Sequence, residues 1–272
     1  MGYSNIILFT DLDGTLLNSD SKVSKENLKA IEHFVAEGGR FGVATGRAMK
    51  NALGFLKGVP LNYYSIFLNG SMLYDMKEGK SIAMNVLDKD SIFPFVRDCV
   101  RKYPSVGIQI YLEDDACFVS PRDLTPDRVI EMHPEYGFVD VEEVHSGKWL
   151  KAFFYGEPEQ LKLVEKDSLY LLEKEMVDGI YTHVNYYELL PKNSSKGSMI
   201  KKMHKLKGDE DIIYAVGDYY NDAEMINEAD VGIFTQNAPE DLKKQADYIC
   251  VDCNENAIAD VIYRIIDGAR HV

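Results

Sequence analysis

Residues 6–15 read Ile6-Ile7-Leu8-Phe9-Thr10-Asp11-Leu12-Asp13-Gly14-Thr15, an apolar strand-like run that delivers two carboxylates and then a glycine turn. Asp and Gly favour turns in general, so a solvated turn after a strand is the ordinary explanation. Two acids set directly against an apolar strand repel each other, however, unless a cation or a proton lies between them. We therefore predict that Asp11 and Asp13 share their strand end with a cation.

Strand-like runs and helical patterns alternate at both ends of the chain, which predicts βαβ units and a parallel sheet. The expected strands are residues 6–10, 40–44, 64–68, 212–216, 231–234 and 248–251. The expected helices are residues 25–37, 48–56, 197–206, 222–228, 240–245 and 257–266. We predict that the two stretches are halves of one doubly wound, Rossmann-like α/β domain.

The middle of the chain has a different character, with half of the aromatic residues, the only Trp, and strand candidates at 106–112 and 149–155. Just before it, Asn69-Gly70 lies between two apolar runs, which predicts a tight hairpin turn. We therefore predict a core domain of residues 1–80 and 188–272 with an inserted α+β domain of residues 81–187. Short paired connections into such an insert act as hinges.

The second strand end carries Thr45-Gly46-Arg47, a hydroxyl, a glycine amide and a guanidinium immediately before a helix. Backbone amides and a hydroxyl at a helix N-terminus suit a phosphoryl oxygen. A threonine there is also an ordinary helix cap, so this segment alone leaves both interpretations open.

Two later segments carry charges at comparable positions. Lys196 opens a helix, where a cation opposes the helix dipole and gains nothing unless an anion is near; a freely solvated lysine is the alternative. Asp218 ends another apolar strand, and Asn221 and Asp222 follow one turn later, although an Asp at that point is also a standard cap. Carboxylates that converge on one sheet edge form an oxygen-rich site suited to Mg²⁺.

Composition limits the partners. A formal net charge of −14 disfavours binding to nucleic acid or anionic membranes and leaves a small diffusible substrate as the better fit. The N-terminal apolar run is too short for a signal peptide or a membrane span, so we expect a cytoplasmic protein. Cys250 and Cys253 have the spacing of zinc sites but lack a second ligand pair, and we expect buried thiols. Nothing in the sequence indicates an oligomeric state.

The four segments resemble, in order, the four signature motifs of the haloacid dehalogenase superfamily, and the large insert resembles the cap of its Cof-like branch. The resemblance implies that Asp11 attacks phosphorus to form an aspartyl-phosphate. It implies that Asp13 protonates the leaving alcohol and then deprotonates the hydrolytic water. It also implies Mg²⁺ ligands at Asp11, the backbone carbonyl of Asp13, and Asp218, with Asp222 supporting the metal shell.

The resemblance further assigns phosphate binding to five positions: the Leu12 amide, Thr45, Gly46, Lys196 and Asn221. Arg47 is expected to contact the substrate, because it directly follows Gly46 at the sheet edge. Tyr219-Tyr220 depart from the branch, which often has acidic or polar residues there. We expect this change to affect the pocket wall and not the metal.

The function expected from these features is hydrolysis of a small phosphomonoester, such as a sugar phosphate or a nucleotide-derived or cofactor phosphate. A phosphomutase and a non-catalytic phosphometabolite-binding protein are the alternatives. The cap is expected to close over the site and to set specificity. Its polar and aromatic residues do not reveal which of them face a substrate; the candidates are Tyr111, Glu113, Asp114, Asp115, Trp149, Lys151 and His183.

Overall fold

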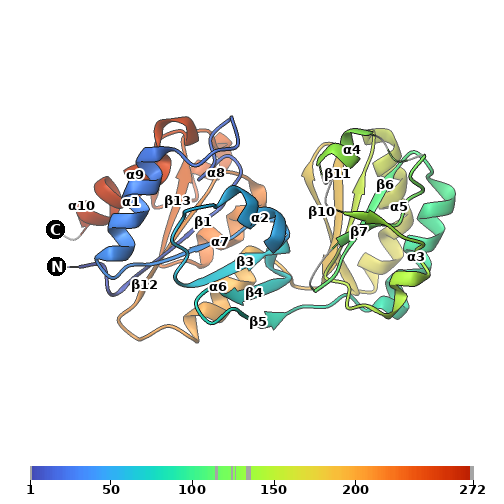
Figure 1. The fold of residues 1–272 in the computed structure, drawn as a ribbon, viewed down its shortest axis with the longest axis horizontal. Helices are drawn as coiled ribbons and strands as arrows, with labels where there is room; N and C mark the ends of the chain where they lie inside the picture. Colours follow the sequence, from blue (N-terminus) through green and yellow to red (C-terminus); the bar gives the residue numbers. More distant parts are fainter. Residues whose placement is uncertain (1, 114–115, 124, 126, 133–135, 270–272) are drawn as a thin grey trace. The chain divides into compact units, whose positions relative to one another are not determined.

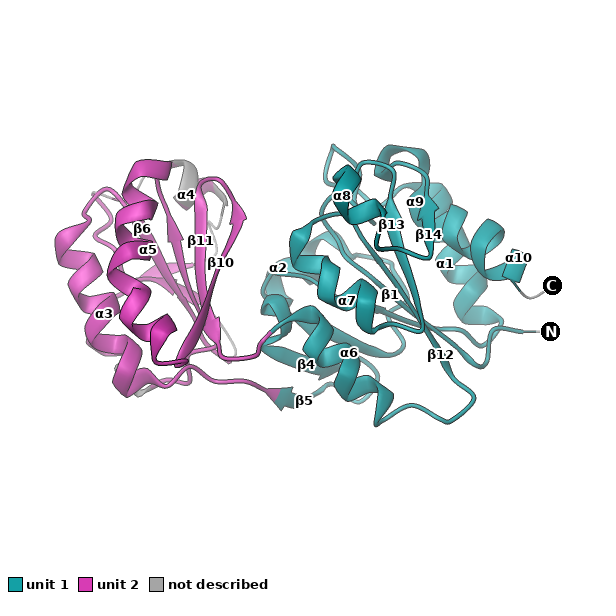
Figure 2. Ribbon diagram, turned by 180° about the vertical axis from the view of Figure 1, so that it is seen from behind, with its two compact units in different colours: residues 1–83, 195–272 teal, residues 84–194 magenta. Residues whose placement is uncertain are grey.

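The computed structural model describes residues 2–113, 116–123, 125, 127–132 and 136–269. The chain divides into two compact units, one of residues 1–83 and 195–272 and the other of residues 84–194 (Figure 2). The predicted boundary at residue 187 lies inside strand β11 (Tyr186–Pro191), which belongs to the second unit because it pairs with two strands of that unit.

A parallel five-stranded sheet forms the centre of the first unit, in the order β14-β13-β12-β1-β2. Its strands are β1 (Ile6–Thr10), β2 (Arg40–Val43), β12 (Ile212–Gly217), β13 (Val231–Thr235) and β14 (Tyr248–Cys250). The chain moves outward in opposite directions from β1 and β12, so the topological switch point lies between these two strands. The predicted doubly wound α/β core is confirmed.

Helices cover both faces of this sheet (Figure 1). On one face α1 (Lys25–Ala36) packs against α9 (Ala257–Asp260), and on the other α6 (Lys196–His204) packs against α7 (Ala223–Glu228). Alternate strand residues supply each half of the core; those beneath α6 and α7 include Ile7, Phe9, Ile213, Ala215 and Phe234. The remaining helices are α2 (Met49–Phe55), α8 (Glu240–Lys243), the π-helical segment Val261–Ile266 and α10 (Asp267–Ala269).

The third predicted strand joins the parallel sheet only weakly. β3 (Tyr64–Phe67) runs beside β2, and among the described residues it forms one parallel bridge there, between Ile66 and Ala44, the residue that follows β2. It pairs instead with β4 (Met72–Asp75) in an antiparallel hairpin, and β5 (Lys80–Met84) completes a separate three-stranded sheet. The predicted turn is confirmed, because Asn69 and Gly70 have φ angles of 51° and 92°, which reverse the chain.

The second unit is a six-stranded mixed sheet in the order β10-β11-β9-β6-β7-β8, with α3 and α5 packed together (Figure 2). Its other strands are β6 (Gly107–Tyr111), β7 (Ala116–Phe118), β8 (Gly137–Phe138), β9 (Lys151–Tyr155) and β10 (Val177–His183). Its helices are α3 (Lys89–Lys102), α4 (Asp127–Met132) and α5 (Pro158–Glu173). This unit has its own hydrophobic core, so the predicted inserted α+β architecture is confirmed.

Two expectations about the whole chain can be compared with the structure. Cys250 and Cys253 are free and buried, so the expected burial of these thiols is confirmed. Across the described residues, every helix is too short or too polar to traverse a bilayer.

The close approach of β2 and β3 provides a test of the fold. A Cβ added at Gly42 would lie 1.9 Å from the Tyr64 carbonyl oxygen. We expect Gly42→Ala to lower the free energy of unfolding by at least about 2 kcal/mol, because the strands must separate. Gly54→Ala is the control, since nothing lies within 4 Å of its added Cβ; as a helix substitution it should gain about 0.5–1 kcal/mol. Urea denaturation measures both, and a Gly42→Ala protein as stable as wild type would contradict the close approach.

Candidate active site

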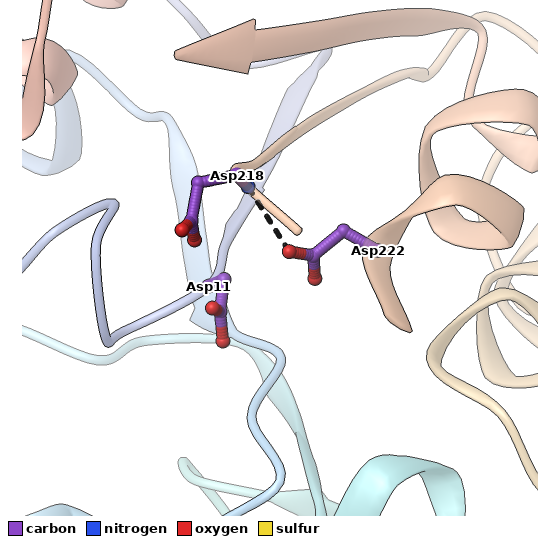
Figure 3. Close-up of side chains that lie close together, drawn as sticks. All are labelled: Asp11, Asp218 and Asp222. Atoms are coloured by element: carbon purple, nitrogen blue, oxygen red, sulfur yellow. Dashed lines mark hydrogen bonds between the residues drawn. The ribbon is translucent and has the colours of Figure 1, made fainter. Parts of the chain in front are cut away.

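Three carboxylates converge at the switch point of the core sheet (Figure 3). Asp11 and Asp218 follow β1 and β12, which are adjacent, and the Asp11 amide donates to the Val216 carbonyl at 2.9 Å. Asp222 lies in the turn before α7. One oxygen from each carboxylate lies within 4.8 Å of the other two.

Lys196 is buried among these acids. Its Nζ donates to Asp11 Oδ1 at 2.8 Å and to Asp222 Oδ1 at 2.6 Å, and the residue is only 1% exposed. Burial lowers the pKa of Lys196, but the two carboxylates outweigh burial and leave the pKa above its ordinary value. The ammonium group is therefore charged, and the alternative of a freely solvated lysine is wrong.

Asp222 supports the other groups. One of its oxygens accepts from Lys196, and the other accepts from the backbone amides of Asp218 and Tyr219 at 3.0 and 3.1 Å. Both oxygens are thus engaged by protein donors. The carboxylate therefore holds the loop after β12 and the lysine in place.

Asp218 is held from the opposite side by the first segment. Thr15 Oγ1 donates to Asp218 Oδ1 at 2.9 Å. Gly14 has a φ of 74°, and a Cβ there would lie 2.4 Å from Asp218 Oδ2, so only glycine fits. Sequence reasoning quoted Thr15 but assigned it no role; its place two residues after a carboxylate was the available signal.

The surroundings of Asp11 and Asp218 disfavour the charged form of both carboxyl groups. Burial raises the pKa of Asp11 well above its usual range; Lys196 lowers it in part, and Asp222, Asp218 and Asp13 raise it further. Burial and then Asp222 raise the pKa of Asp218 to about 7, against the lowering effect of the Thr15 hydrogen bond. Carboxylate oxygens whose negative charge is only partly neutralised are suitable ligands for Mg²⁺. The carboxylates of Asp11 and Asp218 would hold it.

The second segment lies at the end of the neighbouring strand β2. Thr45 is buried, and its Oγ1 accepts from the Arg47 amide at 3.1 Å. A Cβ on Gly46 would lie 2.9 Å from Asn69 Nδ2. Asn69 Oδ1 also accepts from Asn221 Nδ2 at 3.2 Å, so this buried residue connects the second and fourth segments. Sequence reasoning recognised Asn69 only as a turn residue.

Asp13 lies apart from the three converged acids. Its side chain is 52% exposed, whereas Asp11 is buried, and Leu12 between them is fully buried. The Arg47 guanidinium pairs with Asp13 through Nε–Oδ2 at 2.7 Å and Nη2–Oδ1 at 2.8 Å. The chain therefore presents one enclosed carboxylate beside Lys196 and one accessible carboxylate beside Arg47.

Two exposed tyrosines flank the fourth segment. Tyr219 and Tyr220 meet edge to face with ring centres 5.1 Å apart, and the Tyr220 hydroxyl donates to Asp241. They directly follow Asp218, so they form an aromatic margin beside the acid cluster.

Candidates in the second unit divide into packed and exposed groups. Trp149 is a core residue whose Nε1 donates to the Val144 carbonyl. Lys151 is also buried, with its Nζ 3.3 Å from Glu188 Oε1. Asp114 and Asp115 lie outside the described residues. Tyr111 is buried, and its hydroxyl donates to Gln109. Glu113 forms an ion pair with Lys148, and His183 is exposed and accepts a hydrogen bond from the Asn185 amide.

The chain is similar to known proteins over almost its whole length. A family model described as haloacid dehalogenase-like hydrolase matches residues 8–262, which include all four segments. The 5-amino-6-(5-phospho-D-ribitylamino)uracil phosphatase of Bacillus subtilis is 27% identical, over 95% of this chain and 97% of that protein. The chloroplastic endoribonuclease YBEY of Arabidopsis thaliana is 27% identical over 94% of this chain, which spans 46% of that longer protein.

A solved structure shows the same fold. A haloacid dehalogenase-like hydrolase from Bacteroides thetaiotaomicron superimposes with a TM-score of 0.84 at 24% identity, covering 95% of this chain and 98% of the other. Both units are included in that coverage, so the inserted mixed sheet is a shared feature of the architecture.

The buried lysine gives the first test of the site. Lys196→Met leaves two buried acids without a counter-ion, and we expect a loss of about 3–5 kcal/mol in the free energy of unfolding at pH 8. Lys201→Met is the matched control, because Lys201 lies on the same helix and pairs with Glu228 at the surface. Its unfolding midpoint in urea should stay close to wild type. Equal losses in the two variants would contradict the central role of Lys196.

The raised pKa of Asp218 predicts pH-dependent metal binding. Its folded pKa of about 7 exceeds the ordinary value of 3.8, so the folded state binds the extra proton between these values. Stability of the metal-free protein therefore falls as pH rises through this window. Mg²⁺ must displace that proton, and Asp11, whose pKa is also raised, must lose its own, so the affinity should fall at least about thirtyfold from pH 8 to pH 5.5. Thermal shifts at constant ionic strength measure this, and a Mg²⁺ stabilisation equal at both pH values would contradict it.

Proposed function

The chain belongs to the haloacid dehalogenase-like hydrolase family, in its Cof-like branch, and we therefore propose that it is a Mg²⁺-dependent phosphatase acting on a small phosphomonoester. One observation carries this proposal. Asp11 lies buried at the switch point, 2.8 Å from the Lys196 ammonium and beside Asp218. A carboxylate so placed is oriented and partly neutralised, as a nucleophile towards an anionic phosphoryl group must be.

The phosphoryl group is bound by groups at three strand ends and at the start of α6. Donors for its oxygens are the Leu12 and Gly46 amides, the Thr45 hydroxyl, Lys196 and Asn221. Asp11, the Asp13 carbonyl and Asp218, with support from Asp222, would hold Mg²⁺, which would share the phosphoryl charge. Arg47 lies at the margin of this site, where it reaches the substrate directly or through Asp13.

Two displacements then occur at phosphorus, with Asp11 as the attacking group in the first and the leaving group in the second. A carboxylate oxygen of Asp11 forms a bond to phosphorus as the ester P–O bond breaks, and Asp13 gives its proton to the departing alcohol oxygen. Asp13 next removes a proton from water, whose oxygen attacks phosphorus and breaks the bond to Asp11. Inorganic phosphate leaves and both carboxylates return to their starting state. Asp13 is accessible, as an acid that must reach both alcohol and water needs to be.

We propose that the organic part of the substrate is a sugar or a related polyol. The Bacillus subtilis relative is named for a phosphorylated ribityl compound. The acidic surface, with a formal charge of −14, also disfavours polyanionic polymers. We propose a sugar phosphate or a similar phosphometabolite as the substrate class.

Replacement of the nucleophile tests the proposal. Asp11→Asn removes the charged oxygen that attacks phosphorus, and kcat for phosphate release with Mg²⁺ should fall at least about a thousandfold. Asp20→Asn is the matched control, because Asp20 is an exposed acid in the same loop and should leave kcat unchanged. Phosphate release is measured over a panel of phosphorylated metabolites. Unaltered turnover by Asp11→Asn would refute the nucleophile, and phosphoryl return to sugar without phosphate release would identify a phosphomutase.

A further inference from the structure

The Arg47 side chain is held on three sides. Nε and Nη2 donate to the two oxygens of Asp13, and Nη1 donates to Asn51 Oδ1 at 2.7 Å. The guanidinium carbon lies 4.3 Å from the centre of the Phe55 ring. Hydrogen bonds therefore orient the plane of the guanidinium, and the aromatic ring fixes its position from another direction.

The start of helix α2 creates this arrangement. Arg47 lies just before the helix, and Asn51 and Phe55 follow at intervals of four residues, which places all three on one helical face. The backbone of Arg47 is also fixed, because its amide donates to Thr45 Oγ1 at 3.1 Å and its carbonyl accepts from the Leu68 amide at 3.1 Å. Both the main chain and the side chain of Arg47 are thus anchored in the core unit.

Asp13 needs such an anchor more than the other acids of the site. Its side chain is 52% exposed, so packing does not restrict its rotamers as it restricts those of buried Asp11. Single surface ion pairs hold their partners weakly, but a bidentate arginine stacked on a ring imposes a fixed geometry. Small displacements of a reacting group cost rate, so the orientation of Asp13 matters for proton transfer.

We propose that Asn51 and Phe55 are positioning residues that act through Arg47 to hold the Asp13 carboxylate in the orientation that proton transfer requires. The proposal rests on the proposed function, in which Asp13 is the acid and base. Arg47 then serves the reaction through Asp13, and its loss should affect proton transfer more than substrate binding.

Two substrates with different leaving groups distinguish the proposed positioning role of Asn51 and Phe55 from a merely structural one. In a reaction through a covalent enzyme intermediate, kcat/KM reports only the steps up to departure of the alcohol. Glycerol phosphate has a poor leaving group that needs a proton from Asp13, whereas p-nitrophenyl phosphate has a good one that does not. A displaced Asp13 therefore lowers kcat/KM for the first substrate much more than for the second.

The test uses Asn51→Ala and Phe55→Leu, the latter keeping apolar bulk but removing the ring. We expect each to lower kcat/KM about tenfold with glycerol phosphate and less than about threefold with p-nitrophenyl phosphate, within the range of general acid catalysis. In an Arg47→Met background neither should cause a further loss, because the double-mutant cycle then has no Arg47 to act through. Gly54→Ala, on the same helix, is the control and should leave kcat/KM unchanged with both substrates.

Equal losses with the two substrates, or full additivity with Arg47→Met, would overturn the proposal in favour of a structural role. An activity-independent measurement separates its failure from failure of the proposed function. The Arg47 Nε–H signal in nitrogen-15 NMR, assigned by its disappearance in Arg47→Met, should exchange slowly with water because it is bonded to Asp13. Exchange should become about tenfold faster in Asn51→Ala and Phe55→Leu, in line with a lost hydrogen-bond geometry. Unchanged exchange overturns the inference even if the wild type hydrolyses no phosphate ester.

Discussion

Lys196 places a buried ammonium group between Asp11 and Asp222, residues that lie 185 and 26 positions away in the sequence. A buried acid pair without a counter-ion would cost several kcal/mol, so the lysine is what permits these strand ends to meet. Asp222 in turn accepts the amides of Asp218 and Tyr219, which fixes the loop after β12. Removing the ammonium would therefore disturb Asp11 and Asp222 directly, and Asp218 through the loop that Asp222 holds.

The lysine does not neutralise the site completely. The pKa of Asp11 remains raised, and that of Asp218 rises to about 7, because burial and the neighbouring acids outweigh the favourable partners. The fold thus holds carboxylates in a state that a cation stabilises, with Thr15 and the close contact of Gly14 keeping Asp218 in position. Binding of a divalent cation and loss of the Asp218 proton are coupled for this reason.

The strand ends could be predicted from sequence because parallel strands bring their carboxyl ends to one edge, and each strand was an apolar run followed by polar groups. Partners across the site could not be predicted. The burial of Lys196 depends on the packing of α6 against α7 and the turns Leu68–Gly70 and Tyr220–Asp222. Asn69 appeared only as a turn residue because its contact with Asn221 spans 152 positions. The predicted domain boundary at residue 187 lies inside β11. It was placed by a change in composition, whereas the pairing of β11 with β9 and β10 continues past that residue.

The two cations of the site are both committed to acids, and this bears on how a phosphate ester can bind at all. Lys196 contacts Asp11 and Asp222, and Arg47 contacts Asp13, so with Asp218 the four carboxylates and two cations leave a formal charge of −2. A phosphomonoester dianion would meet repulsion from such a site. In the proposed phosphatase, one divalent cation would cancel that charge and turn the unfavourable acid cluster into a phosphoryl-binding surface. Phosphate binding would then be conditional on metal binding, while Lys196 and Arg47 orient Asp11 and Asp13.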